Sequence, residues 1–356
     1  MLAAIPYVAW RIYKILPVKK WLKHSLLAVY CLAVVACALS ATGLIDLLPM
    51  PLARFTYIFG NSWVIFMIYA TILFVLMDVL RLMRLLPARA LENSIAGSAV
   101  VFGLIAVLLT YGAIHYRHKY REEMTVESAK IDQPLKIVLL SDLHIGYHNS
   151  HRELSRWVDL INAEKPDLVL LGGDLMDRSL RAAIADHDAS RLLKIQAPVY
   201  ACRGNHEYHA GIEAADAFYK TAGISLVVDS VVSVRGISLV CREDVINETR
   251  RPLHRLMKMV PKGQFTIVLD HEPTDLLEAQ LNNVDFQFSG HTHNGQVWPL
   301  NWLERMVFEN SYGQLKKGDT RYYVTSGMGI GGGRFRIGTR SEYLVLNLVP
   351  ETTPEN

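Results

Sequence analysis

Five apolar, β-rich segments in the C-terminal two thirds of the chain each end in side chains that bind metals or transfer protons. These residues are Asp142, His144, Asp174, Asn205, His206, His271, His291 and His293. A single aspartate, asparagine or histidine at such a position is usually a helix cap, a turn residue or a core side chain. Five such segments in one chain rarely arise by chance, so the pattern favours one shared site.

The stretch "SGHTHNGQ", residues 289–296, shows what chemistry such a site would do. Side chains two positions apart lie on the same side of an extended segment, so His291 and His293 can face one site. The alternative is a polar loop that contains histidine without a role. Carboxylate, amide and imidazole ligands together suit Mn²⁺, Fe or Zn²⁺ better than Ca²⁺ or Mg²⁺, which prefer oxygen ligands alone.

The elements that must position these residues alternate between strands and helices. "LKIVLL" precedes the helix-like "HRELSRWVDLINAE", "PVYACRG" precedes "IEAADAFYKTAG", and two strands pair around Arg235-Gly236. Such alternation predicts an α/β domain over residues 135–350, with sheets covered by helices. Ligands bind at the carboxyl ends of strands in open α/β sheets, which is where the metal-binding residue types occur. The polar stretch 117–134 is predicted to be a linker.

The first third of the chain predicts a membrane region. Three apolar stretches begin at Ser25, Asn61 and Ser94, and each is about the ~20 residues needed to cross a bilayer. We therefore predict three transmembrane helices within residues 25–116. A cleaved signal peptide is the alternative for the first, but its basic lead-in is long and two more spans follow. Residues 1–24 are predicted to hold an amphipathic helix lying in the membrane interface.

Charge predicts the orientation of these spans. Residues 1–116 hold nine basic and three acidic residues, a net charge of +6, and the remainder has a net charge of −3. Basic residues precede the first span and lie between the second and third, so the N-terminus is predicted to be cytosolic and the α/β domain extracytoplasmic. "RHKYREE" after the third span favours the cytoplasmic alternative. The α/β domain is mildly acidic, which excludes a nucleic-acid-binding surface.

Two cysteines lie in strand-like segments of this domain. Cys202 and Cys241 form either a disulfide or two separate buried thiols.

The motifs "SDLH", "GGDLMD", "GNHE", "LDHEP" and "SGHTHNGQ" appear in an order that resembles the calcineurin-like metallophosphoesterase superfamily. The resemblance covers Leu135 to Val349. It is closest to a branch of membrane-attached bacterial phosphodiesterases, which includes hydrolases of UDP-2,3-diacylglucosamine. That branch often has glycine where this chain has Asn294. The resemblance implies a two-sheet β-sandwich flanked by helices, in four α/β/β/α layers, and a bacterial inner-membrane location.

The same resemblance implies roles for the residues at the segment ends. One divalent metal ion, Mn²⁺ or else Fe or Zn²⁺, would be held by Asp142, His144 and His293, and a second by Asn205, His271 and His291, with Asp174 bridging them. His206 would protonate the leaving oxygen or donate to the phosphoryl group. Asp177, Arg203 and Glu207 would orient these groups. His148, His151 and His209 are interpreted as exposed loop histidines rather than substrate contacts.

These expectations define a membrane-anchored phosphoesterase that uses a metal-activated hydroxide to hydrolyse a phosphodiester or pyrophosphate of a lipid substrate. UDP-2,3-diacylglucosamine pyrophosphatase is one alternative. A non-catalytic membrane protein that binds partners is another, which the complete set of seven ligands disfavours. In "PLNWLERMVFEN", Trp302, Leu303, Met306 and Val307 share one helical face. This face either packs into the core or contacts membrane lipid beside the site. No protein partner is predicted.

Overall fold

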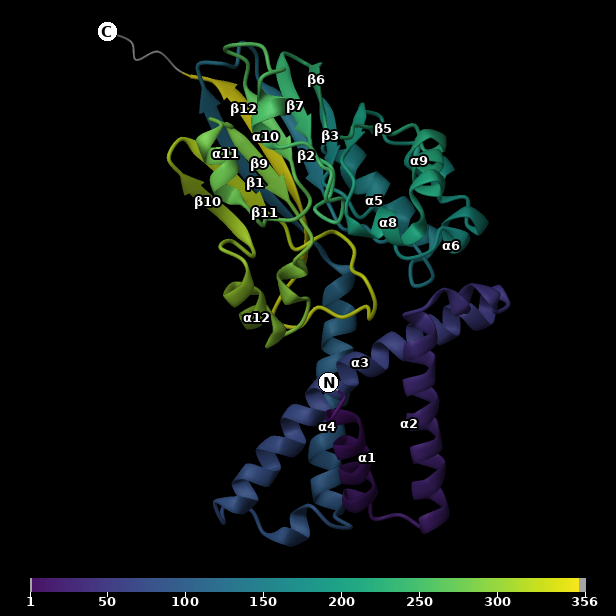
Figure 1. Cartoon of the computed structure of the whole chain (residues 1–356). Coiled ribbons are helices and arrows are strands. Elements are labelled where there is room, and N and C mark those ends of the chain that lie inside the picture. The colour runs from purple at the N-terminus through teal and green to yellow at the C-terminus, as the bar shows by residue number, and fades with distance from the viewer. Residues whose placement is uncertain (1, 352–356) are drawn as a thin grey trace. The chain divides into compact units, whose positions relative to one another are not determined.

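The computed structural model describes residues 2–351 and contains two compact units (Figure 1). One unit comprises Met1–Tyr116 together with Gly332–Ile337. The other comprises Arg117–Gly331 and Gly338–Asn356. A short segment near the C-terminus of the chain therefore belongs to the N-terminal helical unit, although 215 residues separate Tyr116 from Gly332 in sequence.

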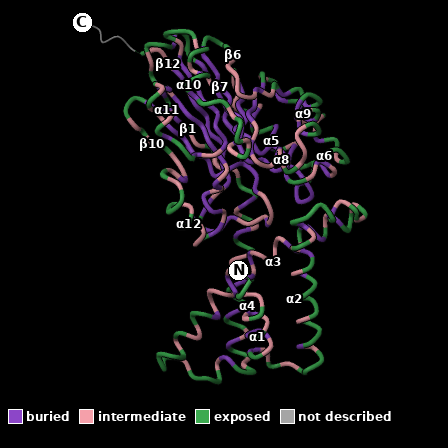
Figure 2. Tube along the Cα trace, in the orientation of Figure 1, coloured by how far each residue is buried: buried purple, intermediate pink, exposed green. Residues whose placement is uncertain are grey.

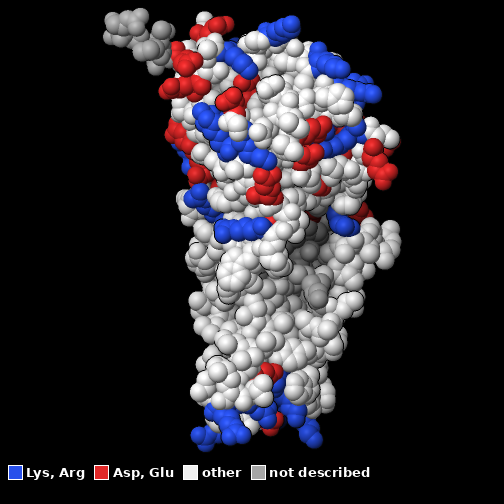
Figure 3. Space-filling model, turned by 60° about the vertical axis from the view of Figure 1, so that its left-hand side comes forward, with Lys and Arg blue, Asp and Glu red and all other residues white. Residues whose placement is uncertain are grey.

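The helical unit contains the three apolar helices that the sequence predicts. They are α2 (Lys20–Ser40), α3 (Met50–Leu82) and α4 (Ile95–Arg117), and each is long and apolar enough to cross a membrane. The helix α3 begins 11 residues before the predicted start at Asn61, with Pro51 in its first turn, where proline is favoured because the first N–H groups of a helix have no partner. Figure 3 shows Lys and Arg gathered at the end of this unit where the α1–α2 and α3–α4 connections lie.

The predicted interfacial helix is α1 (Ala4–Ile15), and α2 already begins at Lys20, so residues 1–24 are not one element. Val8, Ile12 and Ile15 of α1 are buried, as their helical spacing predicts. Arg11 is also buried and donates a hydrogen bond to Asp78 of α3. The apolar face of α1 therefore packs within the helical unit, whereas the prediction assigned that face to lipid.

The α/β unit is built from two six-stranded sheets. The first has the order β1-β12-β2-β3-β4-β5, and the second β10-β11-β9-β8-β7-β6. The strands of the first sheet are β1 (Lys119–Ser128), β2 (Leu135–Leu140), β3 (Leu168–Leu171), β4 (Val199–Ala201), β5 (Ser225–Leu226) and β12 (Ser341–Pro350). Those of the second are β6 (Ser230–Val234), β7 (Ile237–Cys241), β8 (Thr266–Leu269), β9 (Phe286–Ser289), β10 (Gly313–Lys317) and β11 (Thr320–Val324).

Helices cover the outer face of each sheet, which confirms the predicted four-layer α/β/β/α architecture. The first sheet carries α5 (His151–Ala163), α6 (Arg181–Ala185), α7 (Asp188–Leu192), α8 (Asn205–Ala210) and α9 (Ile212–Thr221). The second carries α10 (Leu253–Met257) and α11 (Leu276–Leu281). Between the sheets, side chains such as Ile137, Leu239 and Phe286 form a buried layer. Figure 2 shows that much of the trace of the α/β unit's strands is buried.

Local sequence explains why α5 begins where it does. The Ser150 side chain accepts a hydrogen bond from the backbone N–H of Glu153, a standard N-cap interaction. Leu154, Trp157, Val158 and Ile161 then follow at helical spacing and are all buried against the first sheet. Such helices fill the gap between successive parallel strands.

The predicted linker over residues 117–134 is wrong. Lys119–Ser128 forms β1, which pairs in parallel with β12 along its whole length, from Lys119 beside Ser341 to Ser128 beside Pro350. The stretch looks like a linker because it is an edge strand, whose polar residues face solvent. The α/β unit therefore begins at Arg117 and not at residue 135.

Strand direction explains why the metal-binding residue types meet. The strands β2, β3 and β4 run parallel in the first sheet, and β7, β8 and β9 run parallel in the second. The carboxyl ends of each parallel set lie at one edge of its sheet. Cys202 and Cys241, which follow or end two of these strands, are both free buried thiols, so the disulfide alternative is wrong.

Candidate metal centre

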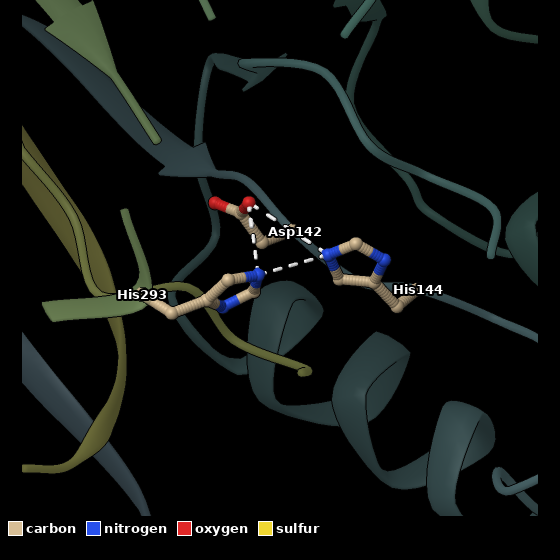
Figure 4. A group of neighbouring side chains, drawn as sticks. All are labelled: Asp142, His144 and His293. Atoms are coloured by element: carbon tan, nitrogen blue, oxygen red, sulfur yellow. Dashed lines mark hydrogen bonds and ion pairs between the residues drawn. The ribbon is translucent and has the colours of Figure 1, made fainter. Parts of the chain in front are cut away.

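Asp142, His144 and His293 form the first group of side chains at this edge (Figure 4). The Nε2 atoms of His144 and His293 are 3.1 Å apart. Asp142 Oδ1 lies 3.5 Å from Nε2 of His293 and 3.8 Å from Nε2 of His144. Asp142 and His144 follow β2, whereas His293 follows β9, so the group joins the two sheets.

Asp174 connects this group to a second one. Its Oδ2 atom lies 3.6 Å from Nε2 of His144 and 3.2 Å from Nε2 of His271. In the second group, His291 Nδ1 lies 3.0 Å from Asn205 Oδ1, and the rings of His271 and His291 are 5.4 Å apart. The structure thus brings all seven predicted ligands together, with Asp174 between the two groups.

The donor atoms have the spacing that metal coordination requires. Two nitrogens that each lie ~2.1 Å from one ion are roughly 3.0–3.4 Å apart, depending on the coordination angle. The 3.1 Å separation of the His144 and His293 nitrogens fits this range. His271 places Nδ1 2.7 Å from the carbonyl oxygen of Gly172, which leaves its Nε2 facing Asp174 Oδ2 at 3.2 Å. Ligand histidines are commonly oriented by such a bond to the other nitrogen.

The backbone at the centre is strained. Asp142, His144, Asp174, His291 and His293 all have positive φ, between 46° and 68°. This region is unfavourable for residues with a side chain, at a cost of order 1–3 kcal/mol each, and such residues concentrate at functional sites. Close packing adds to the constraint, because a Cβ atom at Gly290 would overlap the carboxylate of Asp142. The fold therefore holds these side chains in place against a local cost.

The two buried carboxylates are held in their charged form. Burial alone would raise the pKa of Asp142, but the charge of His293 and a hydrogen bond from His144 outweigh it and keep this pKa well below its usual range. Burial likewise opposes ionisation of Asp174, and the charges of His271 and His206 lower its pKa. Both residues thus offer the anionic oxygens that a divalent cation needs.

The histidines differ in their protonation. Burial and the nearby charge of His271 lower the pKa of His291 to about 4, so its imidazole is neutral near pH 7. Burial lowers the pKa of His271 as well, but the charge of Asp174 outweighs it and raises that pKa well above its usual value. A cation binding beside His271 must displace this proton, so metal binding there releases a proton.

His206 lies beside the ligands without being part of the two groups. Its backbone N–H donates to Asp174 Oδ1 over 2.9 Å, and its Nδ1 lies 3.3 Å from Asp177 Oδ1. Burial favours the neutral ring, but the charges of Asp174 and Asp177 outweigh it and raise the pKa of His206 to about 9. The side chain is 20% exposed, so a protonated imidazole is accessible at the centre.

The residues predicted to orient the site differ in their contacts. Glu207 accepts hydrogen bonds from the backbone N–H groups of Gly204, Asp174 and Leu175, so it positions the bridging aspartate. Asp177 contacts His206 as described. Arg203 pairs instead with Asp216 and Glu243, at 2.6 and 2.7 Å, and contacts none of the seven ligands. Its predicted orienting role at the centre therefore has no support in these contacts.

His148 contradicts its prediction as an exposed loop residue, because it is buried and its Nδ1 lies 3.9 Å from Asp177. His151 and His209 are exposed, as predicted, but they lie in the helices α5 and α8 and not in loops. Residues 327–329, which sequence reasoning did not place at the site, pack on the first ligand. Gly329 N–H donates to the Asp142 carbonyl over 2.9 Å, and a Cβ at Gly327 would lie 2.7 Å from Asp142 Cβ. The glycine-rich run "SGMGIGGG" was the available signal.

Comparison with known proteins identifies the class of this arrangement. Residues 135–295 match the family described as calcineurin-like phosphoesterase. Phosphodiesterase YaeI of Escherichia coli is 31% identical over 229 residues, which cover 61% of this chain and 83% of that protein. The chain belongs to the calcineurin-like phosphoesterase family.

Two further relatives extend the comparison. An uncharacterized metallophosphoesterase of Helicobacter pylori is 30% identical over 65% of this chain, and this chain spans 64% of the length of that protein. A protein of Danio rerio named "transmembrane protein with metallophosphoesterase domain" is 28% identical over 80% of this chain and 71% of its own length. Together with the three apolar helices, this similarity indicates a membrane protein.

Proposed function

We propose that this chain is a membrane-anchored, two-metal phosphoesterase that hydrolyses a phosphodiester or pyrophosphate of a lipid. The observation that carries the hydrolytic part is the convergence of seven metal-binding side chains on two adjacent groups joined by Asp174. The family relationship supports the same reaction class, because one relative is named a phosphodiesterase. A non-catalytic role does not explain why five of these seven residues are held in strained backbone.

The residues present supply the chemistry of such a reaction. Two divalent cations held there would lower the pKa of a bound water and offset charge on the phosphate oxygens. Asp142 and Asp174 supply the negative charge that holds the cations, and Asp174 serves both positions. His206, whose proton is retained by Asp174 and Asp177, would deliver that proton to the leaving oxygen or donate a hydrogen bond to the phosphoryl group.

The donor set also supports a choice of metal. Four imidazoles and one amide accompany only two carboxylates, a mixture that suits Mn²⁺, Fe or Zn²⁺ better than Ca²⁺ or Mg²⁺. We propose Mn²⁺ as the native ion, with Fe and Zn²⁺ as the alternatives. Metal analysis of protein purified without added metal distinguishes them, and activity restored to chelated protein by Mg²⁺ alone would contradict this choice.

The proposal of a lipid substrate depends on α12 (Leu300–Val307), which follows the ligand His293 by seven residues. Its apolar face could have packed into the core. In the structure Trp302 and Leu303 are each 56% exposed, Met306 77% and Val307 74%, so the core interpretation is wrong. An exposed apolar helix face beside a catalytic centre suits contact with lipid. Anchoring by the membrane helices would raise the local concentration of such a substrate.

A double substitution tests the lipid assignment. Trp302→Glu with Met306→Glu is expected to leave hydrolysis of a small soluble aryl phosphodiester unchanged and to reduce hydrolysis of a phospholipid analogue in mixed micelles. The matched control places two glutamates at exposed apolar positions of another helix, Leu277→Glu with Leu281→Glu in α11. Equal micellar activity in the two double variants would contradict a role of α12 in lipid contact.

We further propose a multi-pass location in the bacterial inner membrane, with the α/β unit extracytoplasmic. The basic residues gathered at one end of the helical unit support this orientation (Figure 3). A C-terminal alkaline phosphatase fusion is expected to be active in a bacterial host, because that enzyme folds only after export. An inactive phosphatase fusion together with a fluorescent C-terminal green protein fusion would place the domain in the cytosol.

A further inference from the structure

The glycine-rich run "SGMGIGGG", residues 326–333, is divided between the two units of the molecule. Residues up to Gly331 belong to the α/β unit, Gly332–Ile337 belongs to the helical unit, and the chain rejoins the α/β unit at Gly338. We call Gly332–Ile337 the docked segment. The proposed hydrolysis gives these six residues no role, although they lie within a few residues of the metal centre in sequence.

The docked segment packs closely on α3. The Gly332 N–H donates to the Tyr57 hydroxyl over 3.1 Å, and Tyr57 is itself buried. A Cβ at Gly333 would lie 2.9 Å from the backbone oxygen of Asn61, closer than side-chain carbons normally approach. The absence of a side chain therefore lets the segment lie against the helix at this point.

The docked segment is also held by α4. The Arg336 N–H donates to the Gly112 carbonyl over 3.0 Å, and the Arg336 carbonyl oxygen lies 3.2 Å from Nδ1 of His115. Arg336 and Ile337 are buried, and a Cβ at Gly112 would lie 2.6 Å from Cγ1 of Ile337. The glycine in α4 thus leaves the space that Ile337 fills.

The residues on either side of the docked segment pack beside ligands of the first group. Before it, a Cβ at Gly331 would lie 3.6 Å from the ring of His144. After it, the Thr339 hydroxyl donates to the carbonyl of Gln296, three residues beyond the ligand His293. The segment is therefore flanked on both sides by contacts with the ligand loops of one metal-binding group.

Docking restricts both flanks because the chain is continuous. Gly331 is bonded to Gly332, and Ile337 to Gly338, so their Cα atoms stay ~3.8 Å apart. All three ligands of the first group have positive φ, and residues in such backbone persist only where the surrounding structure over-determines their conformation. A segment fixed on two buried helices offers a constraint of this kind.

We propose that α3 and α4 position the first metal-binding group through the docked segment, with Tyr57 and Gly112 as the positioning residues. The helical unit then contributes to the metal centre as well as anchoring the chain. The proposal rests on the proposed two-metal function. It predicts that weaker docking lowers metal affinity at the first group more than at the second.

Two glycines of α4 provide a matched test. Gly112→Val occupies the space of Ile337, whereas a Cβ at Gly103 would meet no atom of residues 2–351 within 4 Å outside its own helical turn. Full-length chelated protein in nanodiscs is titrated with Mn²⁺ and followed by electron paramagnetic resonance, and His293→Ala identifies the binding step of the first group. We expect that step to weaken about 10–100-fold in Gly112→Val, the usual cost of losing support around a ligand, and less than about twofold in Gly103→Val. Equal affinities in the two valine variants, or equal losses at both steps, would overturn the proposal.

Hydrogen exchange without metal separates this proposal from the proposed function. The Gly329 N–H donates to the carbonyl of Asp142, so its exchange rate reports the support of that ligand. In chelated protein this rate should rise in Gly112→Val and stay at the wild-type value in Gly103→Val. Unchanged exchange in both would overturn the coupling. Absence of Mn²⁺ binding in the wild-type chain would instead contradict the two-metal centre, and the exchange comparison would still decide the coupling.

A second pair of variants serves if valine perturbs α4, which circular dichroism detects. Tyr57→Phe removes the hydroxyl that accepts the Gly332 N–H. Tyr30→Phe is its control, because the buried Tyr30 hydroxyl bonds to Ile5 and Met67 instead. The same exchange rate should rise in Tyr57→Phe and not in Tyr30→Phe. Equal rates in these two folded variants would overturn the role of Tyr57.

Discussion

Two buried clusters of charge lie side by side at the end of β8 and are balanced in different ways. Asp270 and His271 are neighbours in sequence, yet each belongs to a different cluster. Asp270 accepts hydrogen bonds from Arg242 over 2.9 Å and from Arg250 over 3.1 Å. Arg242 also donates to Glu278 over 2.7 Å. In this arginine cluster, the buried Asp270 and the half-buried Glu278 are both paired with arginine.

The metal centre lacks such cations. Among residues 2–351, Asp142 and Asp174 pair with histidines and backbone N–H groups, and neither pairs with Lys or Arg. A histidine balances a carboxylate only while it holds a proton, whereas arginine is always charged. The arginine cluster thus balances its own carboxylate charge, whereas the carboxylates of the metal centre are balanced by an added cation. The difference shows that burial of charge alone does not identify a functional site.

The largest effect that this comparison predicts is at Asp174. Asp174→Ala removes the carboxylate that lies between the two groups, so we expect loss of both metals and of hydrolysis, to the level of chelated wild-type protein. Metal content by mass spectrometry and hydrolysis of an aryl phosphodiester measure the two effects. A variant that keeps two metals and full activity would contradict the assignment of Asp174 as the ligand that bridges the two metals.

His206→Ala is expected to have the next largest effect. The variant should keep its metals, since His206 is outside both groups, and lose ~10²–10⁴-fold in rate, the usual range for proton transfer. The loss should shrink for substrates with a good leaving group, which needs no proton. Rates measured with a series of aryl phosphodiesters give this dependence. An equal loss across the series would assign His206 to phosphoryl stabilisation instead.

Asp270→Asn tests the other side of the comparison. Removing one partner of a buried ion pair leaves arginine charge uncompensated, which costs about 3–5 kcal/mol. We expect a value near the lower end, because Glu278 still pairs with Arg242, and we expect both metals to be retained. Denaturant unfolding and metal analysis give the two quantities. Loss of metal without loss of stability would show that the two clusters are not separate.

The smallest predicted effect is on pH dependence, at a third carboxylate balanced by basic side chains. Burial would raise the pKa of Glu164, but hydrogen bonds from Arg121 and Lys136 outweigh it and lower that pKa. The pKa of Glu164 is lower in the folded state than in the unfolded state, where it is ~4.3, so the ionised side chain stabilises the folded protein above pH ~4.3. That stabilisation is lost as the pH falls through the folded-state pKa. Glu164→Gln should therefore flatten the acid limb of a stability–pH curve and leave the curve above pH ~6 parallel to that of the wild type. An unchanged acid limb would argue against this ion pair.

Much of the candidate site could be predicted from the sequence because the signal is local. Each predicted ligand follows an apolar run with strong strand propensity, and parallel strands bring their carboxyl ends to one edge by topology. The three apolar helices were predictable for a similar reason, since length and hydrophobicity alone specify a span. The ends of the helices and strands were harder to predict. The helix α3 begins well before Asn61, and β1 looked like a linker because an edge strand carries solvent-facing polar residues.

The sequence by itself determined which chemical groups the site has, the order in which strands deliver them, and which segments can enter a membrane. These properties depend on residue type and short-range spacing. Only the tertiary structure decided that Asp270 belongs to an arginine cluster while His271 faces Asp174, that His148 is buried, and that the apolar face of α12 is exposed. Those outcomes depend on which distant segments meet, because partners such as Arg242 and Asp270 are 28 residues apart. Residue type cannot reveal such a pairing.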